Sequence, residues 1–161
     1  MHIRKTRLEE LDEVMDIYAY ARKFMAETGN PNQWGTHKPP RARVEQDILE
    51  GVHYTCEENG EIVAVFFFDT KPDPTYTIIY DGAWPNDKPY GVVHRIASAG
   101  KVKGAGSFCL QWAFAQCGNL RIDTHEDNKV MQHTLAKNGF QYCGVIHLEN
   151  GDPRIAFQKT E

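Results

Sequence analysis

The sequence lacks the features that would place it in a membrane or on nucleic acid. No segment has about 18 consecutive apolar residues, so no helix is expected to span a bilayer. The formal net charge is −4, whereas a surface that binds nucleic acid is usually basic. Residues 1–7 lack the apolar stretch of a secretory signal. We therefore expect a cytoplasmic protein whose partners include neither a membrane nor a nucleic acid.

Motifs for metal binding and thiol chemistry are lacking too. The four cysteines, Cys56, Cys109, Cys117 and Cys143, form no C-x-x-C pair, which argues against a zinc ribbon or a thioredoxin-type site. The seven histidines form no H-E-x-x-H pattern. We therefore expect no metal and interpret the cysteines as small buried hydrophobic residues. Cys143 has no neighbouring base in sequence that would make it a nucleophile.

What remains is the composition of one α/β domain spanning residues 1–161. A length of 161 residues and a hydrophobic fraction of 41% are sufficient for a single core. The apolar periodicity and the turn residues predict, in chain order, a strand at 3–6, helices at 7–28 and 41–49, a hairpin at 53–57 and 62–68, a strand at 92–97, a helix at 104–117, a strand at 120–124, a helix at 127–137, and strands at 140–147 and 154–158. This order predicts antiparallel strands first and a strand–helix–strand–helix unit later.

Short local signals define the first half of the chain. Thr6 and Glu9 match a capping box at the start of the first helix. Asn59-Gly60 between two strand-like runs predicts a tight hairpin. The loop at 30–40 contains three prolines and Trp34. Because a long ordered loop often lines a binding site, we expect this loop to do so.

A glycine-rich turn at residues 101–107 is the most informative motif. It lies between an apolar strand and an amphipathic helix. Main-chain N–H groups at a helix start have no partner within the helix, and glycine at positions 104 and 106 would let a phosphate approach them. Lys101 and Lys103 add positive charge beside the turn. Taken alone, Gly104 and Gly106 equally fit a tight turn without a ligand; the full dinucleotide and phosphate-loop motifs are absent.

The turn and its surroundings resemble the GCN5-related N-acetyltransferase (GNAT) family. Residues 101–106, KVKGAG, are similar to the family signature R/Q-x-x-G-x-G/A, with Lys101 in place of the Arg or Gln. Residues 92–97 and 120–125 resemble the family's fourth and fifth strands. Residues 127–140 resemble its last helix, which ends on Gly-Phe. The resemblance extends over roughly residues 90–145 and, more loosely, over the earlier helix and hairpin.

The resemblance implies a mixed, mostly antiparallel sheet whose central parallel strands splay apart between flanking helices. It also implies acetyl-CoA as co-substrate, with the pantetheine arm in the gap and the pyrophosphate on the helix start. The implied cofactor-binding residues are Ile96, Ala97, Ser98, Lys101, Val102, Lys103, Gly104, Ala105, Gly106, Ser107 and Asn128. Asn128 equally suits a helix N-cap, and the two roles are compatible.

The residues that would carry protons follow the family less closely. Family members often have a tyrosine eight positions after the Asn of the last helix, and this position is Ala136. Tyr142 is a possible replacement as general acid, or else a half-buried strand tyrosine. His94 is the first candidate for the general base, on the same strand face as Ile96 if the strand alternates regularly; the alternative is a structural histidine. Asp123 and His125 are reserve candidates on the next strand.

An aromatic wall is expected for the amine that accepts the acetyl group. Aromatic residues are more often packing residues than recognition residues, and both interpretations remain open here. The candidates for this wall are Trp34, Tyr76, Tyr80 and Trp84, with Asp69 or Asp81 nearby to attract a cation.

The sequence therefore predicts an acetyl-CoA-dependent N-acetyltransferase acting on a primary amine of a small molecule or protein. A non-catalytic acyl-CoA-binding regulatory module is the alternative, motivated by the missing tyrosine. A nucleotide-binding structural domain is a third possibility. The resemblance also leaves a homodimer open.

Overall fold

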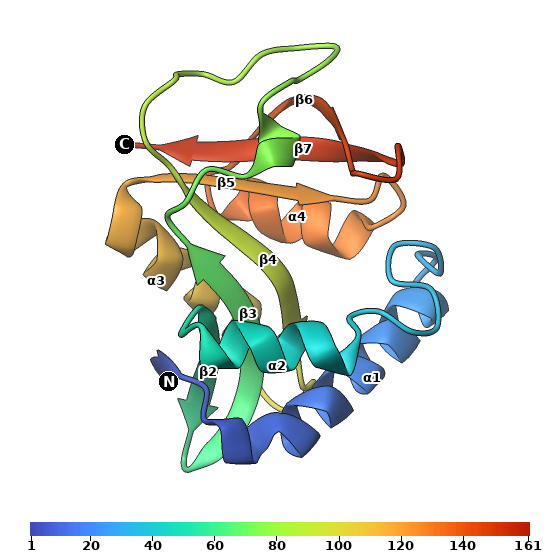
Figure 1. Ribbon diagram of the computed structural model, residues 1–161, viewed down its shortest axis with the longest axis vertical. Helices are drawn as coiled ribbons and strands as arrows, with labels where there is room; N and C mark the ends of the chain where they lie inside the picture. The colour runs from blue at the N-terminus through green and yellow to red at the C-terminus, as the bar shows by residue number, and fades with distance from the viewer.

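The computed structural model describes residues 1–161 as a seven-stranded mixed sheet with helices on both faces (Figure 1). The strand order is β1-β2-β3-β4-β5-β7-β6, and only β4 and β5 are parallel. The strands are β1 His2–Lys5, β2 His53–Glu58, β3 Glu61–Asp69, β4 Gly91–Ser98, β5 Asn119–Thr124, β6 Gln141–His147 and β7 Pro153–Thr160. The helices are η1 Leu8–Glu10, α1 Leu11–Glu27, α2 Arg41–Leu49, η2 Pro74–Tyr76, α3 Ala105–Cys117 and α4 Lys129–Lys137. The predicted α/β class is confirmed, and none of these helices is both long and apolar enough to cross a bilayer.

Each face of the sheet buries its own apolar cluster. Helices α1 and α2 cover β2–β4 on one face, and α3 and α4 lie on the other (Figure 1). Because side chains alternate along a strand, Val65 of β3 packs on the α1 side and Phe66 on the α3 side. The connection between β3 and β4 passes over β5 and β7. Tyr76 belongs to this connection, and its side chain is buried against Val92 and Ile146.

The expected elements form, with a difference at the first helix. The predicted capping box at Thr6 is wrong by one position: the Arg7 N–H donates to the Glu10 carboxylate at 2.8 Å. Thr6 is buried instead, with its hydroxyl 2.7 Å from His53 Nδ1 and 2.7 Å from the Thr55 hydroxyl. Thr6 therefore joins a buried polar network under α1.

Strands β4 and β5 separate soon after they pair. Their parallel pairing is limited to Gly91 with Leu120 and Val92 with Arg121. Beyond Val92 the two strands diverge, and Figure 1 shows β4 running away from β5 toward α1 and α2. The predicted splayed pair of central strands is confirmed, and main-chain groups of β4 past Val92 have no partner on β5.

A β-bulge in β4 changes which side chains share a face. His94 pairs with Phe67, whereas Ala97, three residues later, pairs with Val65, only two residues away. Arg95 lies at the irregularity with φ of 50°. As a result Ala97 packs in the cluster of α1 and α2, and Ile96 packs in the cluster of α3. The expectation that Ile96 shares the face of His94 is therefore wrong, because a bulge inserts one residue into the alternation.

Candidate active site

Two adjoining cavities follow the gap that opens beside β4. The Gly106 cavity, about 270 Å³, extends from Ile96 past the start of α3. The His94 cavity, about 280 Å³, lies between β4, β5 and the loop at 30–40. Met25, Ile96, Asn128 and Met131 line both cavities, so the two form one continuous cleft.

The start of α3 is open at both predicted glycines. Gly104 is the N-cap residue with φ of 81°, a conformation that favours glycine. A Cβ atom at either Gly104 or Gly106 would meet no atom within 4 Å apart from the adjoining backbone. The first hydrogen bond into the helix runs from Phe108 N–H to Gly104 O, so the amides of Ala105, Gly106 and Ser107 precede it and lack helical partners. Such an arrangement can bind an anion.

The rest of the Gly106 cavity is partly apolar. Ile96, Ala97 and Ser98 of β4 form one wall, and their contact with a cofactor stays a prediction. Tyr20 and Phe24 of α1 form the opposite wall and keep 47% and 42% of their surface exposed. Exposed aromatic side chains beside a cavity leave apolar surface available for a ligand.

Four of the predicted cofactor residues do not contribute their side chains to this cavity. Lys101 forms an ion pair with Glu61 at 3.5 Å, and Lys103 points into solvent. Val102 packs against the α3 core and Ala105 is buried within it. Only the main chain of these four residues lies near the helix start.

Asn128 occupies the junction of the two cavities. Its Oδ1 accepts from Met131 N–H at 3.0 Å, so the predicted N-cap role is confirmed. Its Nδ2 donates to Gln33 Oε1 at 2.9 Å, and that oxygen also accepts from Asn30 Nδ2 and the Thr124 hydroxyl. Gln33 thereby fixes the loop at 30–40 across the ends of β5 and α4. Ligand contact by Asn128 stays a prediction.

His94 lies between two carboxylates on the wall of its cavity. Its Nε2 is 2.7 Å from Asp73 Oδ2, and its Nδ1 is 3.8 Å from Asp123 Oδ1. Burial would raise the pKa of Asp73, but hydrogen bonds from His94 and Thr75 outweigh it and lower this pKa to about 2. Asp73 is therefore ionised and can only accept, which makes His94 Nε2–H the donor. A neutral His94 then has its lone pair on Nδ1, beside Asp123.

Tyr76 completes this group, which we call the His94 cluster: Asp73, Tyr76, His94 and Asp123. The Tyr76 hydroxyl donates to Asp123 Oδ1 at 2.6 Å. Burial raises the pKa of Tyr76, and the neighbouring Asp123 carboxylate raises it further. The phenol therefore stays protonated and holds Asp123 in place. Tyr76 was expected as an aromatic wall residue, but its ring is buried beneath the connection.

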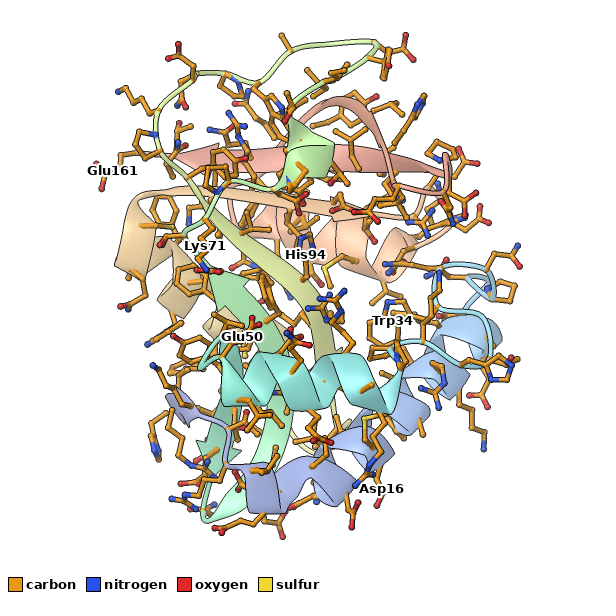
Figure 2. The ribbon with its side chains drawn as sticks, viewed as in Figure 1. Asp16, Trp34, Glu50, Lys71, His94 and Glu161 are labelled. Carbon is orange, nitrogen blue, oxygen red and sulfur yellow. The ribbon has the colours of Figure 1, made fainter.

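Trp34 lies at the other side of the His94 cavity. Figure 2 shows His94 near the centre of the molecule and Trp34 close to the start of α2. The Trp34 ring lines the cavity and meets Tyr18 edge-on, with ring centroids 5.7 Å apart. The structure thus brings Trp34, which was expected in the aromatic wall, to the same cavity as His94 and Asp123, the first and a reserve candidate for the general base.

A buried ion pair supports the same cavity from below. Arg95, which lines the cavity, places its guanidinium 2.6 Å from the Asp47 carboxylate of α2. Asp47 is 1% exposed. Burial raises the pKa of Asp47 although Arg95 acts to lower it. The pair ties α2 to the bulge of β4.

Several predicted residues lie outside both cavities. Trp84 donates from Nε1 to Tyr76 O and lies against Arg121, whose guanidinium carbon is 4.1 Å from the indole centroid. Tyr80 stacks on His147 with centroids 4.6 Å apart. Tyr142, 53% exposed, is on β6 at the far edge of the sheet. The structure therefore does not bring Tyr80, Trp84 or Tyr142 to the cleft.

The other reserve candidate for the base, and the two acids expected near the aromatic wall, also lie elsewhere. His125 Nδ1 accepts from Asp127 N–H at 3.0 Å and serves a turn. Asp69 is at the end of β3, and Asp81 is exposed with φ of 57°. Neither carboxylate lines the His94 cavity, where Asp123 takes the place expected of them.

Sequence reasoning missed Asp73, Gln33 and Arg154. Asp73 follows a Pro-rich turn and reaches His94 across 21 positions of sequence. Gln33 and Arg154 lie far from the glycine motif in sequence, yet the Arg154 guanidinium donates to Gln33 O at 3.4 Å. Nothing local to these residues indicates their place. No group of three or more His, Cys, Asp or Glu side chains is arranged to hold a metal ion.

Comparison with known proteins identifies the family. A scan against protein-family models finds no match, and neither does a search of curated proteins. Among solved structures, a GNAT-family acetyltransferase from Streptococcus agalactiae 2603 is 34% identical, with 99% of this chain and 95% of that chain covered and a TM-score of 0.86. GNAT-family acetyltransferases from Listeria monocytogenes 4b F2365 (19% identical, 98% and 93% covered, TM-score 0.71) and Bacillus cereus ATCC 10987 (21%, 99% and 96%, 0.65) share the fold. The splayed strands, the open helix start and this identity agree: the chain belongs to the GNAT family of acetyltransferases.

Proposed function

We propose that this protein is a cytoplasmic N-acetyltransferase that transfers the acetyl group of acetyl-CoA directly to a primary amine of a small molecule or protein. The observation that best supports this proposal is that two cavities meet at Ile96. The Gly106 cavity includes the open start of α3, and the other cavity includes His94. Family membership supports acetyl transfer, and the residues of the cleft support the identity of the two substrates.

The Gly106 cavity fits acetyl-CoA. The free amides of Ala105, Gly106 and Ser107 suit a pyrophosphate, because a side chain at Gly106 would fill the space in front of them. The aromatic wall of α1 and the unpaired edge of β4 suit the pantetheine arm. Acetyl-CoA supplies an activated acetyl thioester, whose C–S bond breaks as the amine N–C bond forms.

The His94 cluster is suited to receive the amine. The Asp123 carboxylate attracts an ammonium group, and the lone pair on His94 Nδ1 is the nearest base. Asp73 holds the imidazole in the tautomer that leaves Nδ1 free and stabilises the ring when it becomes charged. His94 is therefore proposed as the general base and Asp73 as its positioning residue.

No side chain is proposed as general acid. Ala136 offers no proton, and Tyr142 lies outside the cleft. A thiol has a pKa near 8.5 in model compounds, so a thiolate can leave without a protein donor and take its proton from water. The unpaired N–H groups of β4 past Val92 are proposed to polarise the thioester carbonyl.

A turnover assay tests the proposal. The protein is mixed with acetyl-CoA and a panel of amines, and thiol release is followed, with calorimetry of acetyl-CoA, ATP and NAD in parallel. We expect binding of acetyl-CoA alone among these ligands, and acceptor-dependent thiol release. Binding of acetyl-CoA without turnover on any acceptor would instead support the non-catalytic acyl-CoA-binding module.

A further inference from the structure

We propose that the acceptor is a small amine that also carries a carboxylate, as an α-amino acid does, and that Arg154 binds this carboxylate. The inference rests on the proposed function and names the substrate class of the same site. It is motivated by the charges that surround the His94 cavity.

Arg154 is a buried cation without an acidic partner. It is 7% exposed and lines the His94 cavity. Its two side-chain hydrogen bonds go to carbonyl oxygens, Pro153 O at 2.9 Å and Gln33 O at 3.4 Å. A guanidinium has five N–H donors, and a buried charge without a counter-ion is unfavourable. An anion that enters the cavity would supply the missing partner, and a carboxylate can accept two parallel hydrogen bonds from arginine.

The sheet places Arg154 at a suitable distance from the His94 cluster. Asp123 of β5 pairs with Ala156 of β7. Arg154 lies two residues from Ala156, so it projects from the same face as Asp123, about 7 Å along the strand. A molecule whose amine and carboxylate are separated by one or a few carbon atoms can therefore lie between Arg154 and Asp123.

Most of the other charged side chains on the cavity wall are positive, as Arg154 is. Lys38 of the 30–40 loop and Arg43 of α2 line the cavity, are exposed and form no ion pair. Arg95 is neutralised by Asp47. Asp123 is the one acidic residue of the lining and lies beside His94. The cavity lining thus carries one carboxylate, beside His94, and three cations without an acidic partner, although the whole chain carries a formal net charge of −4.

Two further observations narrow the choice of ligand. The cavity volume of about 280 Å³ is at the small end of ligand sites, which favours a small molecule over a folded protein. Arg154 lines the His94 cavity and not the Gly106 cavity, so its charge is separate from the site proposed for the cofactor phosphates.

The test compares matched acceptors on the unmodified protein. Thiol release from acetyl-CoA is measured with the twenty common L-amino acids and with their carboxamides, which keep the amine and remove the negative charge. We expect kcat/KM for at least one amino acid to exceed that of its carboxamide by tenfold or more, about the effect of one charge-assisted hydrogen bond. Equal rates, or turnover only of peptide amines or of aminophosphonates, would overturn the carboxylate assignment.

Substitutions test which residue binds the carboxylate of the acceptor. Arg154→Gln should raise KM for the amino acid by about tenfold to a hundredfold, with KM for acetyl-CoA unchanged and a smaller rise in KM for the carboxamide. Arg43→Gln, which changes an exposed residue, should raise the same KM by about twofold to fivefold. Arg41→Gln, on the same helix but outside the cavity, is the matched control. A parallel rise in KM for acetyl-CoA would assign Arg154 to the cofactor and overturn the inference.

A failure of the proposed function would be distinguishable. If acetyl-CoA binds but no acceptor turns over, calorimetry of the CoA-saturated protein with the same amino acids and carboxamides still tests the inference. Preferential binding of amino acids supports it, and equal or absent binding overturns it. If Arg154→Gln does not fold, the acceptor comparison and the Arg43→Gln variant give the decision.

Discussion

The two ends of the cleft are built in different ways. The Gly106 cavity takes its open main-chain groups and small residues from one continuous stretch, the end of β4 and the start of α3, and side chains of α1 and α4 line the rest of it. The His94 cavity uses side chains from β4, β5, β7, α2 and the loop at 30–40. A main-chain site can form within one continuous segment, whereas a site made of side chains from separate elements depends on the tertiary fold. Five predictions test this difference, from the largest expected effect to the smallest.

His94→Gln should lower kcat by about a thousandfold, within the usual contribution of a general base. The affinity for acetyl-CoA should not change, because His94 lies outside the Gly106 cavity. Steady-state kinetics as a function of pH measure both quantities, and His133→Gln, an exposed residue of α4, is the control. An unchanged pH profile would remove His94 from the proton transfer.

Arg95→Met should destabilise the protein by about 4 kcal/mol, because it leaves the buried Asp47 charge without a partner. Replacing Asp47 by Asn in the same chain should restore part of this loss. Urea unfolding measures the change in the free energy of unfolding. The exposed pair Arg41 with Asp12 is the control, and Arg41→Met should cost less than about 1 kcal/mol. Equal effects of Arg95→Met and Arg41→Met would contradict the proposed support by a buried pair.

The buried His53 should make stability depend on pH. Burial lowers the pKa of His53 to about 4, against about 6.5 in the unfolded chain. Between these values the unfolded state binds more protons, so stability is complete above about pH 6.5 and falls by roughly 3 kcal/mol toward pH 4. His53→Gln should flatten the free energy of unfolding in this window. The stability that Asp73 contributes should be lost at lower pH, between about pH 4 and 2. If His53→Gln leaves the pH dependence between 6.5 and 4 unchanged, the assignment to His53 is contradicted.

Gly106→Val should weaken acetyl-CoA binding by about a hundredfold, equivalent to two charge-assisted hydrogen bonds of about 1.5 kcal/mol each. Calorimetry measures the change. Gly106 is a better test than Gly104, whose φ of 81° would be strained by valine regardless of any ligand. Ala42→Val, the second residue of α2 as Gly106 is of α3, controls for the branched side chain. If Gly106→Val binds acetyl-CoA normally, the phosphates of acetyl-CoA do not bind at the start of α3.

Lys101→Met should change KM for acetyl-CoA by less than about threefold, since an exposed charge is screened and contributes little. Lys101 is already paired with Glu61 at 3.5 Å. Kinetics at low and physiological salt would check this. A tenfold rise would mean that side-chain charge, rather than the main chain, dominates cofactor binding.

The elements of the fold were largely predictable, because each depends on neighbours in sequence. The hairpin at Asn59-Gly60, the helix start at Gly104 and the cap at Asn128 all follow from local chemistry. The bulge at Arg95 was not predictable, since no local sequence signal marks it and the residues that pair with it, Asp47 of α2 and the strand β3, are distant in sequence. That one inserted residue moved Ile96 to the opposite face from the one expected.

The sequence alone determined the family resemblance and the open main-chain groups at the start of α3, because a turn and the helix that follows it are one uninterrupted segment. Only the tertiary structure decided that Asp73 holds His94, that Asp123 lies opposite, and that Trp84, Tyr80 and Tyr142 point elsewhere. The physical reason is distance along the chain. Side chains from separate strands and loops meet only when strand register and loop contacts, such as those of Gln33, are fixed by the folded core.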